Sequence, residues 1–574
     1  MKVNVFVHTI EDVEYFYEKL YEDRYKYVIY TTHAGVYEYI KRSSNIDKMI
    51  LSELVSQEII IDINNKAIEH SNRIVNNLDK KYASLISKAI GIKKMNFFIP
   101  LYSYTLPRLL SGLMFFKEMI LKLDNGNRNI VFEYKHNIYK TISLKNYLNL
   151  YAQSTKIEWY ESNKVSKRNK YELLIKFFKN LPKAYNLLID IIYEYFAYKS
   201  NNETTILYMQ DLYDLEFIKR LNQFRLITYS HQGLNHKFAK SENKHIDINI
   251  SNIFKEKDAL LNLIIKNFLN NSRGYFQGLN NLKSLIKSNN INMALWGNPP
   301  IIGFKSLFYE YCKIENIKTV GMQHGGTYIS QNKQNEYSSD YARCSHYISY
   351  GFTKEDLNNN FKDYNNDKIS VYPFGTTKTL NLKDNISKKK IDILFPVTNS
   401  ISMLEGGLIR VKPDILHKDQ INILNLLETK CKNSLTCIVK PMKNTNIWQT
   451  SVFMKLQKMK YVKVEFEKTL IDILSVVTPK CVIIEYNSTP LYEILELDVD
   501  IFLFNRSMDN LTKKAEEMLN KRVYIVRDFE DFSILFEKYI QNYLPKKRDD
   551  SFYKYYINKK DTKLNIINLL NNID

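Results

Sequence analysis

The chain has 574 residues, of which 45% are hydrophobic and 25% are charged, a composition that indicates a globular protein of several domains and excludes a disordered or collagen-like chain. Lys and Arg number 82 against 62 Asp and Glu, which gives a net charge of +20. The basic residues are scattered and form no stripe with aromatic residues. We therefore expect no nucleic-acid partner, and we attribute the charge to a Lys-rich composition with weak attraction to an anionic membrane.

The cysteines are odd in number and include no Cys-x-x-Cys pair. This pattern disfavours a disulfide framework and a zinc site, and it favours a reducing compartment. Residues 1–8 are typical of a strand and are too short for the apolar segment of a signal peptide. These observations predict a cytoplasmic protein.

The first 380 residues alternate short runs of β-branched and aromatic residues with longer segments of helical periodicity, which predicts a parallel sheet covered by helices. The predicted strands are Val3–His8, Tyr27–Thr32, Glu58–Ile63, Thr205–Met209, Arg225–Tyr229, Met293–Trp296 and Lys318–Met322. Residues from about 65 to 200 are mostly helical in pattern. We therefore predict an N-terminal α/β domain, residues 1–380, with a large helical insertion.

The segment Met95–Phe116 is long and apolar enough to be tested as a membrane span. It contains Arg108, two prolines and a glycine, which favour a buried pair of helices. Contact with a membrane surface and a full span are the less favoured alternatives.

A polar stretch that closes with three lysines places a domain boundary near residues 376–390. The strands predicted beyond it are Ile391–Phe395, Thr436–Val439, Val462–Phe466, Cys481–Ile484, Ile501–Phe504 and Arg522–Val526. The helices predicted between them are Lys418–Cys431, Thr469–Val477, Leu491–Leu497 and Phe529–Asn542. This alternation predicts a doubly wound α/β domain at 388–545, followed by a basic tail, 546–574, with one apolar helix, Lys563–Leu570.

Ligands of such domains bind at the carboxyl ends of the strands, and the run Gly321–Tyr328 follows one of them. His324 suits acid–base chemistry or binding of an anionic group, and Gly325 and Gly326 allow close approach of a ligand to the backbone. The alternative is a structural Gly-Gly turn with a capped histidine.

Two α/β domains in series predict a cleft between them, and three further residues are placed at its edge. Asn298 ends the preceding strand, and Gln323 adjoins the histidine, so both are candidates for acceptor binding. Glu336 follows His324 by twelve residues in a polar loop and is the second candidate for a catalytic base.

Ser488 and Thr489 lie where a predicted helix of the second domain begins, with Pro490 in its first turn. A helix start can bind phosphate through free N–H groups, and Glu493, one turn later, can accept hydrogen bonds from a ribose. A plain helix cap is the alternative reading of the Ser-Thr pair.

Asn399 and Ser400 leave the first strand of the second domain in a polar turn that can offer N–H groups to a phosphate. Lys440 ends the next strand and can neutralise a phosphate; a solvated lysine is the alternative. The sequence has no P-loop, no Gly-x-Gly-x-x-Gly run, no Gly-x-Ser-x-Gly run and no His-Glu-x-x-His run. No histidine pair has metal-ligand spacing, so we predict no metal site.

These elements resemble the GT-B class of glycosyltransferases. The runs Val482–Leu497 and Val499–Phe504 are similar to the donor-nucleotide element of that class. The run Val320–Tyr328, with its Gln-His-Gly-Gly signature, and the run Ser345–Gly351 are similar to bacterial surface-carbohydrate transferases. These lie near the Kdo and capsule polysaccharide transferases and the glycerophosphotransferases of teichoic-acid synthesis. The resemblance covers about residues 290–505.

The resemblance implies two Rossmann-like domains that face a cleft, with the donor nucleotide on the second. Ser488 and Thr489 would hold phosphate, Glu493 the ribose, and Lys440 the charge of the leaving group. His324, or alternatively Glu336, would act as the base, with no metal and no cofactor.

The implied donor is a nucleotide-activated sugar, such as CMP-linked Kdo or a sialic-acid-like sugar. The implied acceptor is a surface polysaccharide or lipid-linked glycan, such as capsule or lipopolysaccharide, at the inner face of the cell membrane, where the enzyme would bind peripherally. A glycerophosphotransferase or a nucleotide-sugar epimerase on the same fold is the alternative, and a non-catalytic binding protein is the third hypothesis.

Overall fold

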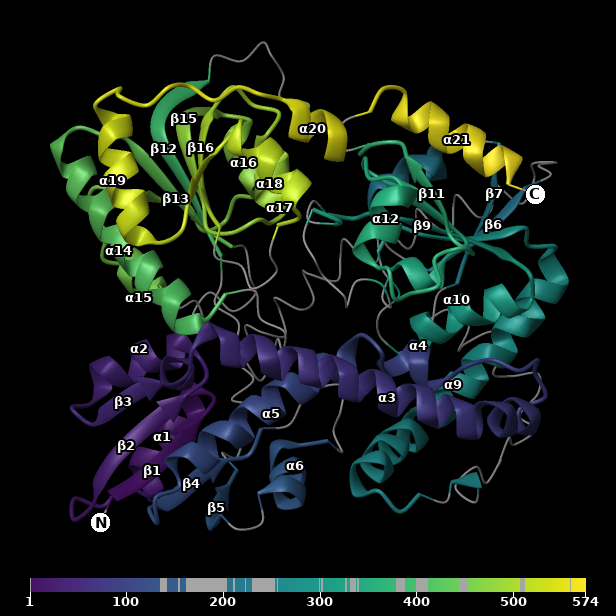
Figure 1. Ribbon diagram of the computed structural model, residues 1–574, viewed down its shortest axis with the longest axis horizontal. Coiled ribbons are helices and arrows are strands. Elements are labelled where there is room, and N and C mark those ends of the chain that lie inside the picture. Colours follow the sequence, from purple (N-terminus) through teal and green to yellow (C-terminus); the bar gives the residue numbers. More distant parts are fainter. Residues whose placement is uncertain are drawn as a thin grey trace, which may run out of the picture.

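The computed structural model describes the chain except for residues 1, 135–141, 153–154, 162–203, 210–211, 222, 230–252, 255, 299, 301–302, 326–327, 331–336, 338–339, 378–387, 399–410, 443–451, 506–510, 558 and 574. The described residues form three parallel sheets (Figure 1). They are called the first, second and third sheets here, in chain order.

The first sheet has the strand order β3-β2-β1-β4-β5. Its strands are β1 (Lys2–Val7), β2 (Lys26–Thr31), β3 (Asp47–Ile50), β4 (Arg128–Phe132) and β5 (Ile157–Tyr160). The helical elements that connect them are α1 (Ile10–Lys19), α2 (Ala34–Ser43), η1 (Leu51–Leu54), α3 (Gln57–Ala89), α4 (Phe98–Tyr102), α5 (Thr105–Leu123) and α6 (Leu144–Tyr151).

The second sheet has the order β11-β10-β9-β8-β6-β7. Its strands are β6 (Thr205–Tyr208), β7 (Arg225–Thr228), β8 (Met293–Trp296), β9 (Lys318–Met322), β10 (His346–Ser349) and β11 (Ser370–Pro373). Its helical elements are η2 (Tyr213–Arg220), α9 (Ala259–Asn289), α10 (Phe304–Ile314), η4 (Tyr341–Arg343) and α12 (Lys354–Asn360). The largest hydrophobic core continues from this sheet through α3, α4 and α5 to the first sheet.

The third sheet has the order β14-β13-β12-β15-β16-β17. Its strands are β12 (Lys389–Val397), β13 (Cys437–Pro441), β14 (Lys463–Val464), β15 (Val477–Ile484), β16 (Asp500–Phe504) and β17 (Tyr524–Val526). The helices are α14 (Pro413–Asn433), α15 (Phe453–Leu456), α16 (Leu470–Leu474), α17 (Thr489–Ile494), α18 (Lys513–Asn520) and α19 (Phe529–Ile540). A separate hydrophobic core lies on each face of this sheet.

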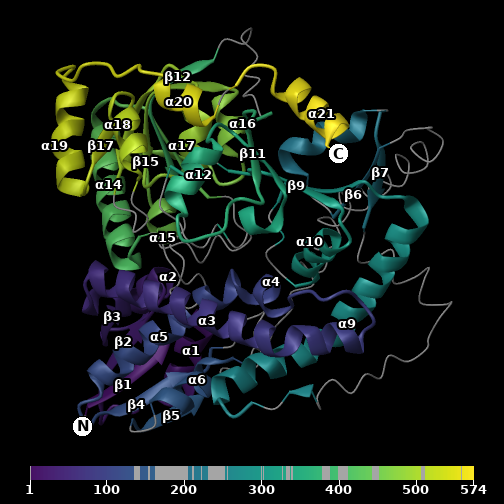
Figure 2. The ribbon, with the colours of Figure 1, turned by 45° about the vertical axis from the view of Figure 1, so that its right-hand side comes forward.

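The C-terminal segment ties the second and third sheets together. Helix α20 (Ser551–Tyr556) packs Phe552 and Tyr556 into a core of the third sheet. Helix α21 (Thr562–Asn572) then places Ile566 and Leu570 in the core of the second sheet. Figures 1 and 2 both show this crossing, in yellow. The segment predicted as a basic tail with one apolar helix is therefore a strap between the two sheets.

The α/β class with doubly wound parallel sheets is confirmed, and the strands Met293–Trp296 and Lys318–Met322 have the predicted bounds. The predicted boundary near 376–390 falls between β11 and β12. The second sheet and the third sheet correspond to the two predicted α/β units.

Two predictions for the N-terminal region are wrong. The run Glu58–Ile63 lies in α3, because Ile60 and Ile63 begin a buried stripe at three- and four-residue spacing along that helix. The described residues of the predicted insertion at 65–200 are mostly helical, as predicted, but they also contain β4 and β5, which complete the first sheet. Residues 1–380 therefore hold two sheets, where one was predicted.

The apolar segment Met95–Phe116 forms α4 and part of α5, and most of its side chains are buried in the large core. The Asp79 carboxylate accepts hydrogen bonds from the backbone N–H groups of Phe97, Phe98 and Ile99 at 2.7, 3.0 and 2.6 Å, which fixes the entry into α4. The favoured prediction of a buried helix pair is confirmed. Within the described part of the chain, no helix combines the length and apolarity needed to cross a bilayer.

Candidate active site

Two turns predicted to carry ligand-binding residues meet in the structure. One turn follows β9 in the second sheet, and the other follows β15 in the third sheet. A Cβ atom at Gly325 would lie 3.3 Å from Thr489 Oγ1. Ser330 Oγ lies 2.6 Å from the Tyr492 hydroxyl, and its backbone oxygen accepts from Thr512 N–H at 2.9 Å. Residues from the two predicted motifs therefore face each other across the junction of the two sheets.

His324 is held by a buried hydrogen-bonded pair. The Tyr328 hydroxyl lies 2.5 Å from His324 Nδ1 and donates to Asp340 Oδ1 at 3.0 Å. Because a phenol has a single proton, its oxygen must accept from Nδ1–H when it donates to Asp340. In this tautomer Nε2 of the half-buried imidazole carries no proton, which is the form that a general base requires.

Gln323 shapes the turn that carries His324. Its Nε2 donates to Gly325 O at 2.7 Å, and its Oε1 accepts from Tyr350 N–H at 2.9 Å. The side chain is buried, and these bonds tie the turn to the end of β10. Contact of Gln323 with an acceptor stays a prediction.

The start of α17 is not a plain helix cap. Ser488 has the extended backbone conformation of an N-cap residue, but its side chain makes no capping hydrogen bond. The adjacent Asn487 is buried and donates to Ser330 Oγ at 3.3 Å. Its Oδ1 atom is buried and accepts no hydrogen bond from any residue that the structure describes. Polar groups at this turn are thus available to a ligand.

Glu493 lies one turn into α17 and is half-buried. Together with Asp214, its charge raises the pKa of Tyr350, an effect that comes mainly from burial of the phenol. Since Tyr350 follows β10 of the second sheet, the Glu493 carboxylate lies on the side of α17 that faces the second sheet. Ribose binding by Glu493 stays a prediction.

Glu485, directly after β15, is a site residue that the sequence did not reveal. It is fully buried and accepts hydrogen bonds from the backbone N–H of Thr398, at 2.6 Å, and from the Thr398 hydroxyl. Burial raises its pKa to about 7. Gln420 of α14 donates to Thr398 O at 2.8 Å, so three elements meet at this carboxyl group.

Of the other predicted site residues, some lie in the described part of the chain and some do not. Lys440 is buried near the end of β13 and donates to Pro441 O, and Asn298 is half-buried after β8. Their contacts with substrate stay predictions. Gly326, Glu336, Asn399 and Ser400 lie outside the described residues, although Thr398, which immediately precedes two of them, is fixed by Glu485.

No group of three or more His, Cys, Asp or Glu side chains in the described ranges has the geometry to hold a metal ion. Metal-independent transfer stays a prediction. The arrangement places an oriented imidazole from the second sheet beside hydroxyl, amide and carboxyl groups from the third.

Comparison with known proteins gives one family and several distant structures. The sequence model of the LIC12162 family transferases matches residues 116–521, which is more than half of the chain. No curated protein matches.

Three solved structures illustrate the fold-level likeness. The MnaA–UDP structure from S. aureus is 9% identical and covers 64% of this chain and 96% of its own, with a TM-score of 0.40. The UDP-GlcNAc 2-epimerase from Neisseria meningitidis bound to UDP-GlcNAc is 13% identical and covers 64% and 100%, with a TM-score of 0.37. MurG from Acinetobacter baumannii is 10% identical and covers 64% and 100%, with a TM-score of 0.35.

Proposed function

Because the chain belongs to the LIC12162 family of transferases, we propose that it is a glycosyltransferase that uses a nucleotide-activated sugar. The observation that carries this proposal is the meeting of the two turns. His324, with its partners Tyr328 and Asp340, lies on one side, and the uncapped Ser488 lies on the other. A base and a phosphate-binding turn at one junction suit group transfer from a phosphorylated donor.

On this proposal, the donor lies on the third sheet. Ser488 and Thr489 hold its phosphate through hydroxyl and backbone N–H groups, and Glu493 accepts hydrogen bonds from the ribose. Lys440, with Asn399 and Ser400, stabilises the negative charge that develops on the leaving nucleotide. Such stabilisation is expected to be the largest catalytic contribution.

The acceptor approaches from the second sheet. Its hydroxyl oxygen attacks the anomeric carbon of the donor, the bond from that carbon to the nucleotide phosphate breaks, and the hydroxyl proton passes to Nε2 of His324. The imidazolium that forms donates from Nδ1 to Tyr328, which in turn donates to Asp340. Tyr328 and Asp340 are positioning residues in this step, and Glu336 is the alternative base.

The finer assignments are part of the same proposal. The donor is a CMP-linked acidic sugar, and the acceptor is a surface polysaccharide or lipid-linked glycan of the cell envelope. The net charge of +20 supports weak attraction to the anionic inner face of the membrane, where such acceptors are extended.

The first test is thermal unfolding of the full chain with CMP, CDP, UDP and GDP and with their sugars. A bound ligand adds about 2.7 kcal/mol of stability at a concentration one hundred times its dissociation constant, so one nucleotide family should raise the unfolding temperature clearly. No shift with any of them would overturn the proposal.

Product analysis then separates the alternatives. Release of nucleotide together with growth of a glycan acceptor supports the glycosyltransferase. Conversion of the sugar without an acceptor would indicate an epimerase, and transfer of glycerol phosphate would indicate the glycerophosphotransferase.

A further inference from the structure

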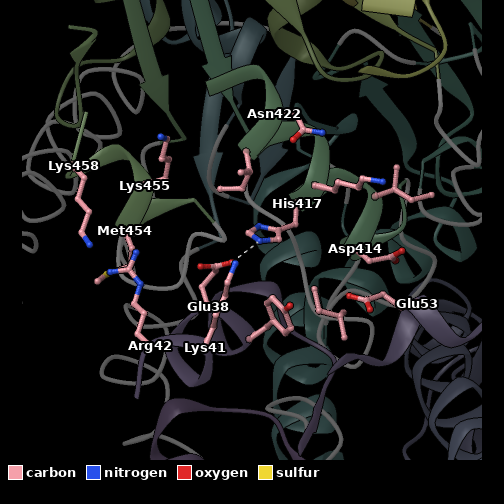
Figure 3. A pocket seen from close by; sticks show the side chains of 15 residues that line it. Glu38, Lys41, Arg42, Glu53, Asp414, His417, Asn422, Met454, Lys455 and Lys458 are labelled. Atoms are coloured by element: carbon pink, nitrogen blue, oxygen red, sulfur yellow. Dashed lines mark hydrogen bonds and ion pairs between the residues drawn. The ribbon is translucent and has the colours of Figure 1, made fainter. Parts of the chain in front are cut away.

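A second hollow lies between the first and third sheets, apart from the His324 turn. It has a volume of about 760 Å³ and is lined by α2 and η1 on one side and by α14 and α15 on the other (Figure 3). This volume is within the range of small-molecule sites. The chain supplies this hollow only because the unpredicted first sheet packs beside the third.

Contacts between the elements of the first sheet and those of the third sheet fix the walls of this cavity. His417 Nε2 of α14 lies 3.0 Å from Glu38 Oε1 of α2, and both side chains are mostly buried. Lys412 donates to Val55 O at 2.8 Å, and Ser52 donates to Asp414. The cavity is therefore preformed by the packing of the two units.

One side of the cavity is strongly cationic. Figure 3 shows Arg42, Lys455 and Lys458 along this side, and Lys418 also lines the cavity. None of these four side chains makes an ion pair with a residue in the described part of the chain. Like charges that converge from two units repel each other, and a bound anion would remove that repulsion.

His417 belongs to the buried wall of the cavity. The side chain is more than nine-tenths buried, and its Nε2 is engaged by Glu38. Its Nδ1 atom is also buried and has no hydrogen-bond partner among the residues that the structure describes. Because Nδ1 has almost no accessible surface, a ligand in the cavity does not reach it, and the charge pattern of the lining is what indicates the ligand.

The opposite side of the cavity is acidic. Figure 3 places Glu53 and Asp414 there. Burial and the charge of Asp414 raise the pKa of Glu53, so the two carboxyl groups lie close enough to repel. Carboxylates of this kind accept hydrogen bonds from neutral hydroxyl groups, while the cationic side binds an anion.

We propose that this cavity is a binding site for an anionic saccharide, whose charged group contacts Arg42, Lys455 and Lys458 and whose hydroxyls contact Glu53 and Asp414. A free inorganic anion would make no contact with the carboxylates on the acidic side. A neutral sugar would place no negative charge beside the cationic side chains. The site is separate from the donor turn, although α14 borders both: Gln420 of the same helix contacts Thr398 beside Glu485.

Isothermal titration calorimetry of the full chain tests the proposal with two matched pairs of probes. Trigalacturonate and glucose 6-phosphate are expected to bind, and maltotriose and glucose are not. Affinity should fall as NaCl is raised, because the contacts are charged. The double variant Lys455→Glu/Lys458→Glu, and separately Arg42→Glu, should each weaken binding of the charged probes by about tenfold or more.

The control is the double variant Lys432→Glu/Lys538→Glu, which changes the net charge equally at exposed positions on α14 and α19. It should bind as the unmodified chain does. Three outcomes would each overturn the proposal. The control variant could weaken binding as much as the test variants do, maltotriose could bind as tightly as trigalacturonate, or both charged saccharides could fail to bind. Inorganic phosphate that binds as tightly as glucose 6-phosphate would overturn the saccharide assignment.

This measurement needs no transfer reaction and no nucleotide. Its outcome is therefore independent of the proposed activity. Nucleotide binding measured on the same variants should be unchanged, which separates the cavity from the donor turn.

Discussion

The turn after β9 and the turn after β15 lie against each other but differ in how their polar groups are used. In the turn after β9, the side chains make hydrogen bonds to other residues around the second sheet: Gln323 holds the turn, and Tyr328 and Asp340 hold His324. In the turn after β15, Ser488 caps no backbone N–H, and Asn487 Oδ1 accepts no hydrogen bond from a described residue. Catalytic groups gain from being held before substrate arrives, whereas ligand-binding groups need free hydrogen-bonding capacity.

Removing the base should have the largest effect. His324→Ala should lower kcat by on the order of a thousandfold, because it removes the group that we propose takes the acceptor proton. The stabilisation of the protein by nucleotide should stay unchanged, since the proposed donor site lies on the third sheet. Single-turnover assays and thermal unfolding with nucleotide measure the two effects. Retained transfer would remove His324 from the mechanism and leave Glu336 as the base.

Glu485 provides a test of the second turn through stability. Burial holds its pKa at about 7 in the folded state against 4.5 in the unfolded chain, so the folded protein binds more protons between these values. The contribution of Glu485 to the free energy of unfolding is therefore complete below pH 4.5. It falls by on the order of 3 kcal/mol as the pH rises to 7. Glu485→Gln should flatten this profile in urea unfolding measured at a series of pH values.

Part of the slope should persist in Glu485→Gln below pH 6. Burial also raises the pKa of Asp79, to about 6, and that carboxyl group lies at the start of α4, away from this turn. A profile identical to that of the unmodified protein would show that Glu485 is not protonated in the folded state.

The sequence predicted these two turns better than the architecture around them. His324 and Ser488 each follow a strand that the sequence predicts, and residues at the carboxyl end of a strand in a parallel sheet lie at the edge where ligands bind. Strands β1 and β2 were predicted, but the first sheet was not separated from the second, because β3, β4 and β5 were not recognised beside the helical segments that surround them.

The partners of His324 and the protonation of Glu485 could not be predicted from the sequence. Tyr328 and Asp340 approach His324 only once the chain after β9 folds back on itself. Glu485 is an ordinary acidic residue in the sequence, and only the packing of Thr398 and α14 buries it. Interpretation of Glu58–Ile63 as a strand failed for the same reason, because the core that selects the helix is distant in sequence.

Tyr328→Phe should produce an intermediate effect on the first turn. Loss of the hydroxyl leaves Nδ1 without its acceptor, so the required tautomer is no longer favoured and the imidazolium loses a hydrogen bond. We expect kcat to fall by about 10 to 100-fold. The acidic limb of the pH profile of kcat/KM should move to lower pH, which loss of fold alone would not cause.

Tyr337→Phe is the matched control, because its hydroxyl also donates within the same region, to Asn365 O at 2.9 Å, but does not contact His324. It should leave the pH profile in place. An equal shift in both variants would contradict the positioning role of Tyr328.

The smallest expected effect distinguishes ligand binding from helix capping at the second turn. Ser488→Ala should weaken nucleotide binding by about tenfold, the value of one hydrogen bond to a charged phosphate. It should leave the free energy of unfolding nearly unchanged, because the hydroxyl caps nothing. Thr469→Ala, which removes the capping box of α16 in the same unit, should show the reverse: a loss of about 1 kcal/mol in stability and unchanged affinity. Calorimetry with the nucleotide identified in the thermal screen, and urea unfolding of both variants, measure the four values. If Ser488→Ala destabilised the chain as Thr469→Ala does and left affinity intact, the Ser-Thr pair would be a helix cap, and the donor would have to be placed elsewhere on the third sheet.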